Sequence, residues 1–198
     1  MITLQYNVRG VATLIQENKQ MSDPMNPYVR QLSQLTKIRN KSDDIYWEIG
    51  KQEFTGFLYF DDATGLPCIP DYVWRGFFVS TGGASKKFKE GTMAKTGLVV
   101  QGNSVLEYDG PKDIDGMWDA GLYRVDMLPL GRGARVRRTR PEFKVGWVAK
   151  PIFEIDEDVV PDPINTVSKW MHFGGMRVGL QGWRPTHGRF KVEGYEVL

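Results

Sequence analysis

Residues 61–77 constrain the fold of this chain more than any other segment. They read Asp-Asp-Ala-Thr-Gly-Leu-Pro-Cys-Ile-Pro-Asp-Tyr-Val-Trp-Arg-Gly-Phe. The run Asp-Ala-Thr-Gly favours a tight turn in which Gly65 tolerates a positive φ. Pro70 suits the first turn of a helix, where its missing N–H costs nothing, and Asp71 places a negative charge at the positive end of the helix dipole. The segment therefore predicts a tight turn, a corner bracketed by prolines, and a helix that begins at Pro70.

Arg75 and Gly76 are unusual neighbours in the second turn of such a helix. A glycine inside a helix costs about 1 kcal/mol relative to alanine. A residue without a side chain is useful where something must come close to the backbone. We therefore expect either another helix or a ligand to pass close to Gly76.

The composition indicates one globular protein without a metal or disulfide framework. The chain has 198 residues, of which 41% are hydrophobic and 25% charged, and its net charge is +2. The single cysteine, Cys68, excludes an internal disulfide and any multi-cysteine metal site, and only two histidines are present. Cys68, held between prolines, is expected to be buried and inert. We expect neither a metal nor a cofactor.

The sequence also predicts where the protein resides. No apolar run approaches the ~20 residues that cross a bilayer, and the amino-terminal residues lack the basic and apolar regions of a secretory signal. We expect no membrane partner. The expected location is the reducing cytoplasm of a prokaryotic cell, whether the gene is cellular or viral.

The order of the expected elements predicts an α+β fold. Helices are expected at 28–53, split near 39–42, at 70–80 with a continuation at 84–88, and at 163–171. Strands are expected at 2–17 with a bulge at Gly10, and at 55–60, 97–105, 123–128, 144–155 and 189–197. This order fits a central antiparallel sheet with helices on one face, for which a ferredoxin-like βαββαβ core is the simplest template.

The motif Asp-x-x-Thr-Gly-x-Pro-x-Ile-Pro, followed by a helix that carries Trp-Arg-Gly, resembles the repeat-associated mysterious protein (RAMP) superfamily. It looks most like the backbone subunits that coat the guide RNA of CRISPR effector complexes in antiviral defence. The resemblance implies a ferredoxin-like (RRM-like) core over residues 1–198 as a single RAMP-like domain. It implies a charged β-ribbon or thumb inserted at about 107–140, and contact of Arg75 and Gly76 with RNA.

Two features depart from that family. The chain is short for such a backbone subunit, and the helical segment 28–53 separates the first strand from the motif. Where the family has a cleaving aspartate, it lies in the loop after the first strand. Asp23 occupies the comparable loop, in a Ser-Asp-Pro setting that also suits a plain turn.

A strongly basic ribbon follows at residues 131–140. On a strand, Arg135 and Arg137 share one face, while Arg138 and Arg140 share the other. Guanidinium groups bind phosphates and stack on bases, so the ribbon can hold a single strand of nucleic acid. Two alternatives are a solvated edge hairpin, and a contact with an acidic surface such as residues 107–119 of a neighbouring copy, which would build a filament or ring. The arginines of the predicted contact are Arg132, Arg135, Arg137, Arg138 and Arg140.

A glycine-rich loop at 174–188 provides a second cluster. Glycines let backbone N–H groups converge on a phosphate, and adjacent cations and a tryptophan ring complete a nucleotide cradle. The alternative is a tight corner in which Trp183 fills the core. The cluster comprises Arg177, Trp183, Arg184, His187 and Arg189, and the exposed Lys86 and Lys87 extend the predicted interface.

We therefore expect a non-catalytic protein that binds single-stranded nucleic acid, RNA in preference to DNA, and self-associates along it. One alternative is a phage-encoded protein that mimics such a subunit and inhibits a host CRISPR effector complex by binding its subunits (an anti-CRISPR). Another is an RNA endonuclease that uses His172 or His187 with the cations Arg184 and Arg189. The carboxylates at 109–119 lack the ligand order of a calcium loop, and we expect a solvated loop there.

Overall fold

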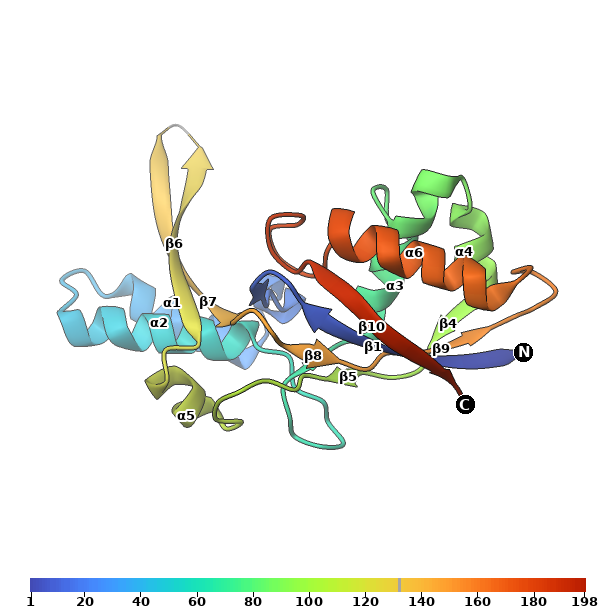
Figure 1. Cartoon of the computed structure of the whole chain (residues 1–198). Coiled ribbons are helices and arrows are strands. Elements are labelled where there is room, and N and C mark those ends of the chain that lie inside the picture. Colours follow the sequence, from blue (N-terminus) through green and yellow to red (C-terminus); the bar gives the residue numbers. More distant parts are fainter. Residues whose placement is uncertain (132) are drawn as a thin grey trace. The chain divides into compact units, whose positions relative to one another are not determined.

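The computed structural model describes residues 1–131 and 133–198, so the predicted contact of Arg132 lies outside the described residues. The chain forms two compact units (Figure 1). The first unit comprises residues 1–14, 60–109 and 144–198, and the second comprises 15–59 and 110–143. A single domain with an insertion at about 107–140 stays a prediction; the second unit also draws on residues 15–59.

The first unit has the βαββαβ topology of a ferredoxin-like core. Its elements, in chain order, are β1 (Ile2–Gly10), α3 (Asp71–Val79), β4 (Leu98–Val100), β9 (Ile152–Ile155), α6 (Pro163–Arg177) and β10 (Phe190–Val197). The strands lie in the order β10-β1-β9-β4, and each neighbouring pair is antiparallel. Each helix thus connects two strands that are not neighbours in the sheet. The predicted α+β, ferredoxin-like fold class is confirmed.

Shorter elements complete this unit. They are β3 (Cys68–Ile69), which pairs with β5 (Ser104–Val105), β8 (Val148–Ala149), which pairs with β1, the 3-10 helix η2 (Ala84–Phe88) and α4 (Gly91–Gly97). The strand predicted at 144–155 is broken at Lys150-Pro151, and that at 97–105 is two short strands. Proline has no N–H to give a ladder, which explains the first break. Cys68 is fully buried, and burial raises the pKa of its thiol to about 12.

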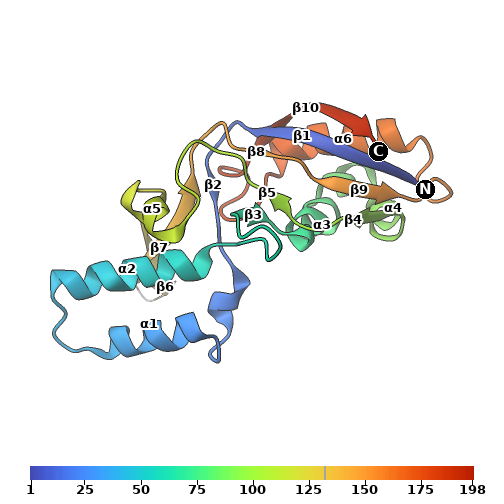
Figure 2. The ribbon, with the colours of Figure 1, turned by 90° about the horizontal axis from the view of Figure 1, so that it is seen from below.

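Alternation along β1 places the core on one face of the sheet. Leu4, Tyr6 and Val8 are fully buried, and the hydroxyl of Tyr6 is 2.9 Å from that of Ser168 on α6. The ring of Phe153 on β9 meets Trp74 and Phe78 of α3 on the same side. Figure 2 shows the strands in front of α6. Both crossover helices therefore cover one face, as predicted, and the other face is left without them.

Three glycines are required by close packing in this core. A Cβ at Gly175 would lie 2.5 Å from the carbonyl oxygen of Phe190, and one at Gly174 would lie 2.3 Å from the ring of Phe77. A Cβ at Gly10 would lie 2.1 Å from the indole of Trp147. Two predictions were wrong here. Gly174 and Gly175 belong to α6 rather than to a loop, and β1 has no bulge at Gly10: the register shift lies between Asn7 and Val8, where β10 carries the extra residue Glu193.

The second unit combines helices with a two-stranded ribbon. Its elements are Ile15 of the short β2 (Leu14–Ile15), η1 (Lys19–Ser22), α1 (Pro27–Lys37), α2 (Asp43–Phe57), α5 (Ile114–Asp119), β6 (Tyr123–Gly131) and β7 (Ala134–Phe143). β7 lies between β2 and β6 in one sheet. The predicted split of the helical segment is confirmed, with Ser42 preceding α2.

Two local predictions fail in this unit. Of the strand expected at 55–60, residues 55–57 are the last turn of α2, and Phe60 forms an isolated bridge with Pro67. The helix extends this far because Phe54 is fully buried against the rings of Trp118 and Tyr123, which the helical path allows. The expected solvated loop at 109–119 contains α5. The carboxylate of Asp113 accepts the N–H of Gly116 at 2.8 Å and so caps that helix.

No helix among residues 1–131 and 133–198 is both long and apolar enough to span a bilayer.

Replacing Gly175 by alanine should destabilise the protein by about 1–3 kcal/mol, since the new Cβ meets a backbone oxygen that cannot move aside. Urea unfolding followed by tryptophan fluorescence measures the change. Gly82→Ala is the control, because a Cβ at Gly82 meets nothing within 4 Å. Equal stability of the two variants would contradict this packing.

Candidate nucleic-acid interface

A groove lies where α3 ends and α6 ends in the first unit. One hollow of about 260 Å³ is lined by Ser80, Gly82, Arg177, Val178, Arg184 and Pro185. A second, of about 310 Å³, is lined by Thr81, Gly82, Gly83, Lys86, Lys87, Phe173, Arg177 and Val178. The two hollows share Gly82, Arg177 and Val178, so they form one continuous surface. We call it the basic groove.

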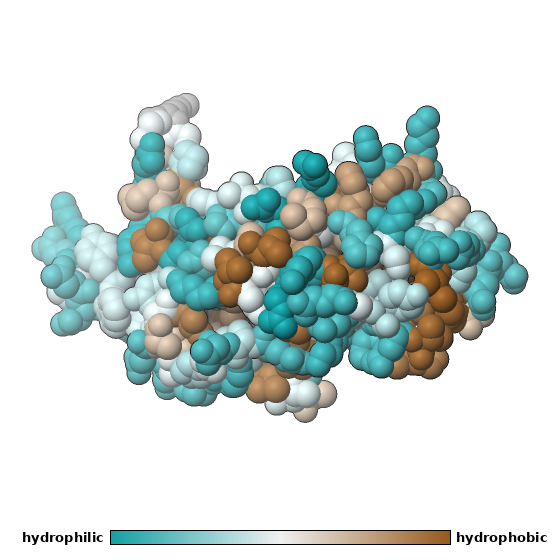
Figure 3. Space-filling model, in the orientation of Figure 1, coloured by the Kyte–Doolittle hydropathy of each residue, from teal (hydrophilic) through white to brown (hydrophobic). Residues whose placement is uncertain are grey.

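Four predicted contact residues meet in the basic groove: Lys86, Lys87, Arg177 and Arg184, all of them exposed. No carboxylate lines either hollow. None of the four takes part in an ion pair recorded for residues 1–131 and 133–198. Figure 3 shows hydrophilic side chains projecting above α6 and the short helices beside it. Four positive charges without a counter-charge make this groove attractive to an anion.

Local backbone geometry brings these cations together. Arg177 is the last residue of α6, and Gly179, with φ of +71°, turns the chain away immediately after the helix. The N–H of Leu180 then bonds to the carbonyl of Gly188 at 2.9 Å, which closes the loop that carries Arg184. On the other wall, Gly83 allows the tight turn after α3, since a Cβ there would lie 2.3 Å from the carbonyl oxygen of Phe78.

Gly82 is a groove residue that sequence reasoning missed. A Cβ there would meet nothing within 4 Å, and its φ lies outside the left-handed region. Neither packing nor conformation within the described chain explains a glycine at this exposed position. The signal was present in Thr81-Gly82-Gly83, which was predicted only to interrupt the helix between 70–80 and its continuation at 84–88. A glycine that its own protein does not require leaves the groove wall open to a ligand.

The same reasoning applies to Gly76 on α3. A Cβ there would also meet nothing within 4 Å, so no helix of the described residues packs against it. Of the two alternatives, another helix or a ligand, the first is therefore excluded within the described chain. Arg75 beside it is exposed, whereas Trp74 is fully buried and anchors the helix. Arg75 precedes Ser80 of the groove by about 7.5 Å of helix axis.

Three further predicted residues lie on the loop after α6. Trp183 is 42% exposed, which excludes the alternative in which it fills the core. Its ring centroid is 6.0 Å from that of His187, whose Nδ1 is 2.8 Å from the hydroxyl of Thr13. Arg189 is half-buried, and its Nε is enclosed without a hydrogen-bond partner. Of the predicted contact residues on this loop, Trp183 and Arg184 are thus the exposed ones, whereas His187 and Arg189 are half-buried.

In the second unit, two arginines of the predicted ribbon contact serve the fold instead. Arg140 is 1% exposed, with Nη2 3.3 Å from Asp126 and Nη1 3.5 Å from Glu17, so the prediction that it contacts nucleic acid is wrong. Arg138 donates to the buried Glu53 at 2.6 Å, and the other oxygen of Glu53 accepts the N–H of Thr139. Both arginines have this structural role because a carboxylate that is buried away from water requires a positively charged partner.

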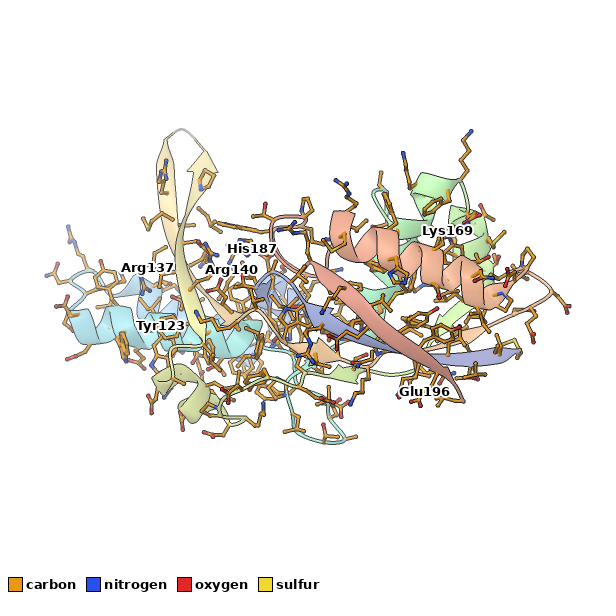
Figure 4. All side chains as sticks on the ribbon, in the orientation of Figure 1. Tyr123, Arg137, Arg140, Lys169, His187 and Glu196 are labelled. Carbon is orange, nitrogen blue, oxygen red and sulfur yellow. The ribbon has the colours of Figure 1, made fainter. Side chains whose placement is uncertain are left out.

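The remaining two ribbon arginines stay available. Arg135 is exposed, and Arg137, which is half-buried, donates to the hydroxyl of Thr139 at 3.1 Å. Figure 4 shows Arg137 and Arg140 on β7 of the ribbon. The alternation along β7 therefore separates these four arginines by role, and among them Arg135 is the exposed one.

Among residues 1–131 and 133–198, no three His, Cys, Asp or Glu side chains are grouped so that they could hold a metal ion.

Comparisons with known proteins identify the fold alone. No protein-family model matches the chain, and no curated protein matches it. A chain in the cryo-EM structure of the type III-B Cmr-beta complex bound to cognate target RNA is similar, with 13% sequence identity and a TM-score of 0.53. The match covers all of this chain and 60% of that one. The chain thus spans less than two thirds of its structural neighbour, and the likeness lies in the α+β architecture.

Arg140→Ala should destabilise the protein by about 1.5–3 kcal/mol, because it removes a buried hydrogen bond to the carboxylate of Asp126, which Arg124 continues to hold. Chemical unfolding monitored by tryptophan emission reports the loss, since Trp118 stacks on Tyr123 in the same unit. Arg135→Ala removes the same charge at an exposed position and should leave stability within about 0.5 kcal/mol of the wild type. Similar losses in both variants would refute a structural role for Arg140.

Proposed function

We propose that this protein binds single-stranded nucleic acid, RNA rather than DNA, through the basic groove. The observation that carries the proposal is the meeting of Lys86, Lys87, Arg177 and Arg184 around a glycine wall with no lining carboxylate. Phosphate oxygens are the anions that such a groove suits best, because lysine and arginine donate charge-assisted hydrogen bonds to them. Contacts of this kind hold the backbone of a strand without reading its sequence.

The exposed ring of Trp183 supports a single strand over a duplex. It lies next to Arg184 in sequence, so a base unstacked from its neighbours could rest on it while its phosphate meets the groove. RNA is favoured by the resemblance of the 61–77 motif to RAMP proteins and by the fold shared with a chain of an RNA-bound complex. Arg75 and Gly76 on α3 extend the proposed contact toward the beginning of that helix.

The proposed role is that of a non-catalytic RAMP-type backbone subunit of a CRISPR effector complex, which self-associates along the strand. Arg135 and Arg137 of the ribbon provide a second cationic contact, either with the strand or with a neighbouring copy.

Each of two single variants, Arg177→Ala and Lys86→Ala, should weaken binding to a 20-nucleotide single-stranded RNA about tenfold or more. The reason is that a hydrogen bond to a charged group contributes about 1.5–3 kcal/mol. The loss should be the same for unrelated sequences. The slope of log affinity against log salt should fall by about 0.7 per lost contact. Fluorescence anisotropy over a range of salt concentrations measures both.

Lys95→Ala is the matched control, since Lys95 is an exposed lysine of the same unit that does not line the groove. Unchanged affinity in both groove variants would rule out the groove as the site. Absence of RNA binding by the wild type, with binding to isolated effector subunits instead, would favour an interaction protein over an RNA-binding one.

Gly82→Val should weaken RNA binding while leaving thermal stability close to that of the wild type. The reason is that the valine side chain fills the shared wall of the two hollows without meeting other protein atoms at its Cβ. Anisotropy and thermal melting on the same preparation separate the two effects. Wild-type affinity in this variant would show that no ligand approaches the backbone there.

A further inference from the structure

The face of the sheet opposite the two crossover helices carries a second surface. Because Leu4, Tyr6 and Val8 point into the core, the alternate residues Gln5 and Asn7 of β1 point to the other face. Residues directly opposite in an antiparallel pair share a face. Gln5 is opposite Glu196 and Asn7 is opposite Gly194, so these four residues of β1 and β10 lie together.

This face is hollowed at Gly194. A cavity of about 310 Å³ is lined by Gln5, Tyr6, Asn7, Lys150, Gly194, Tyr195 and Glu196. A Cβ at Gly194 would meet nothing within 4 Å, and the φ of this residue lies outside the left-handed region. Glycine weakens the interior of a strand and often marks a place where a ligand or another backbone approaches closely. The missing side chain at Gly194 leaves a floor of bare peptide between Asn7 and Glu196.

Two acceptors beside this floor, the carboxylate of Glu196 and Oδ1 of Asn7, have no recorded partner among the described residues. Lys150 is held by Glu107 at 2.8 Å, and Glu193 is shared by Arg9 at 2.7 Å and Lys191 at 3.3 Å, so each of these cations has a carboxylate partner. In contrast, Glu196 takes part in none of the ion pairs recorded within residues 1–131 and 133–198, and neither does Glu154, which lies on the same face opposite Thr3. The Oδ1 atom of Asn7 is enclosed without a donor.

These charges determine what can bind. An unpaired carboxylate with amide oxygens beside it repels phosphate and attracts a cation that carries several N–H donors. A guanidinium is planar, can lie flat on the exposed peptide of Gly194, and bonds a carboxylate with two parallel N–H groups. A lysine ammonium is compact and strongly hydrated, so it would bind more weakly than a guanidinium to a flat peptide surface with acceptor groups beside it.

We propose that the cavity over Gly194 is a protein-docking site that receives an arginine side chain of a partner polypeptide, with Glu196 and Gln5 as its acceptors. Figure 4 marks Glu196 near the end of β10. The site lies on the sheet face that α3 and α6 leave uncovered, and its charge is opposite to that of the basic groove. One chain would thus bind nucleic acid and a basic protein segment through separate surfaces.

Titration of isotope-labelled protein with N-acetyl-arginine methylamide tests the proposal by two-dimensional NMR. The backbone amide signals of Gln5, Gly194 and Glu196 should shift and saturate, with a dissociation constant on the order of 1–10 mM for this single side chain. The lysine analogue should bind more weakly, and the citrulline analogue, which has the same shape without charge, should cause no saturable shift. Saturation by citrulline, or by adenosine monophosphate in place of arginine, would overturn the proposal.

Two variants locate the effect. Glu196→Gln should weaken the arginine probe at least fivefold, and Gly194→Leu should abolish saturation by filling the cavity. Glu154→Gln removes a carboxylate from the same face outside the cavity and should leave the affinity unchanged. Single-stranded RNA binding should stay at the wild-type level in all three, so failure here is distinct from failure of the proposed function. If Glu154→Gln and Glu196→Gln weakened binding of the arginine probe equally, the attraction would come from the overall negative charge of this face, and the proposed site would be refuted.

Discussion

The close approach of α6 to its neighbours is the constraint on which the first unit depends. Gly174 and Gly175 let the helix backbone come down onto Phe77 and Phe190, where any side chain would collide. This contact seals an aromatic core in which Trp74, Phe77 and Phe190 meet at ring distances of 5.5–6.0 Å. It also fixes where α6 ends, and therefore where Arg177 lies relative to the turn after α3. The basic groove is a consequence of this helix packing, because one wall is the segment that follows α3 and the other is the end of α6 with the loop that follows it.

Arginines in the two units have different physical roles. Arg138 and Arg140 of the ribbon neutralise the buried carboxylates of Glu53 and Asp126, so they stabilise the second unit. Arg177 and Arg184 remain exposed and without a recorded carboxylate partner within the described chain, so their charge stays available for a ligand. Residue type alone does not separate these roles. Burial separates them, because a carboxylate that is removed from water requires a cation beside it, whereas an exposed guanidinium is solvated by water and requires no partner.

Much of the fold was predictable from local chemistry. Pro70 and Asp71 correctly placed the start of α3, and the alternation of apolar residues in β1 and β10 indicated strands with one buried face. The strand expected at 55–60 failed because Phe54 is held by Trp118 and Tyr123, which lie far away in the sequence. The candidate site was predictable in part: Lys86, Lys87, Arg177 and Arg184 were chosen as isolated cations, and only the fold brings them to one groove.

The glycines separate what the sequence determined from what tertiary structure decided. By itself, the sequence determined the element order, the start of the helix after the proline corner, and the unusual frequency of glycine at 76, 82–83 and 174–188. It could not say which glycines serve packing and which leave a surface open. That distinction depends on atoms brought close from distant parts of the chain: a Cβ at Gly175 or Gly10 would collide with them, while at Gly76, Gly82 and Gly194 it would meet open space.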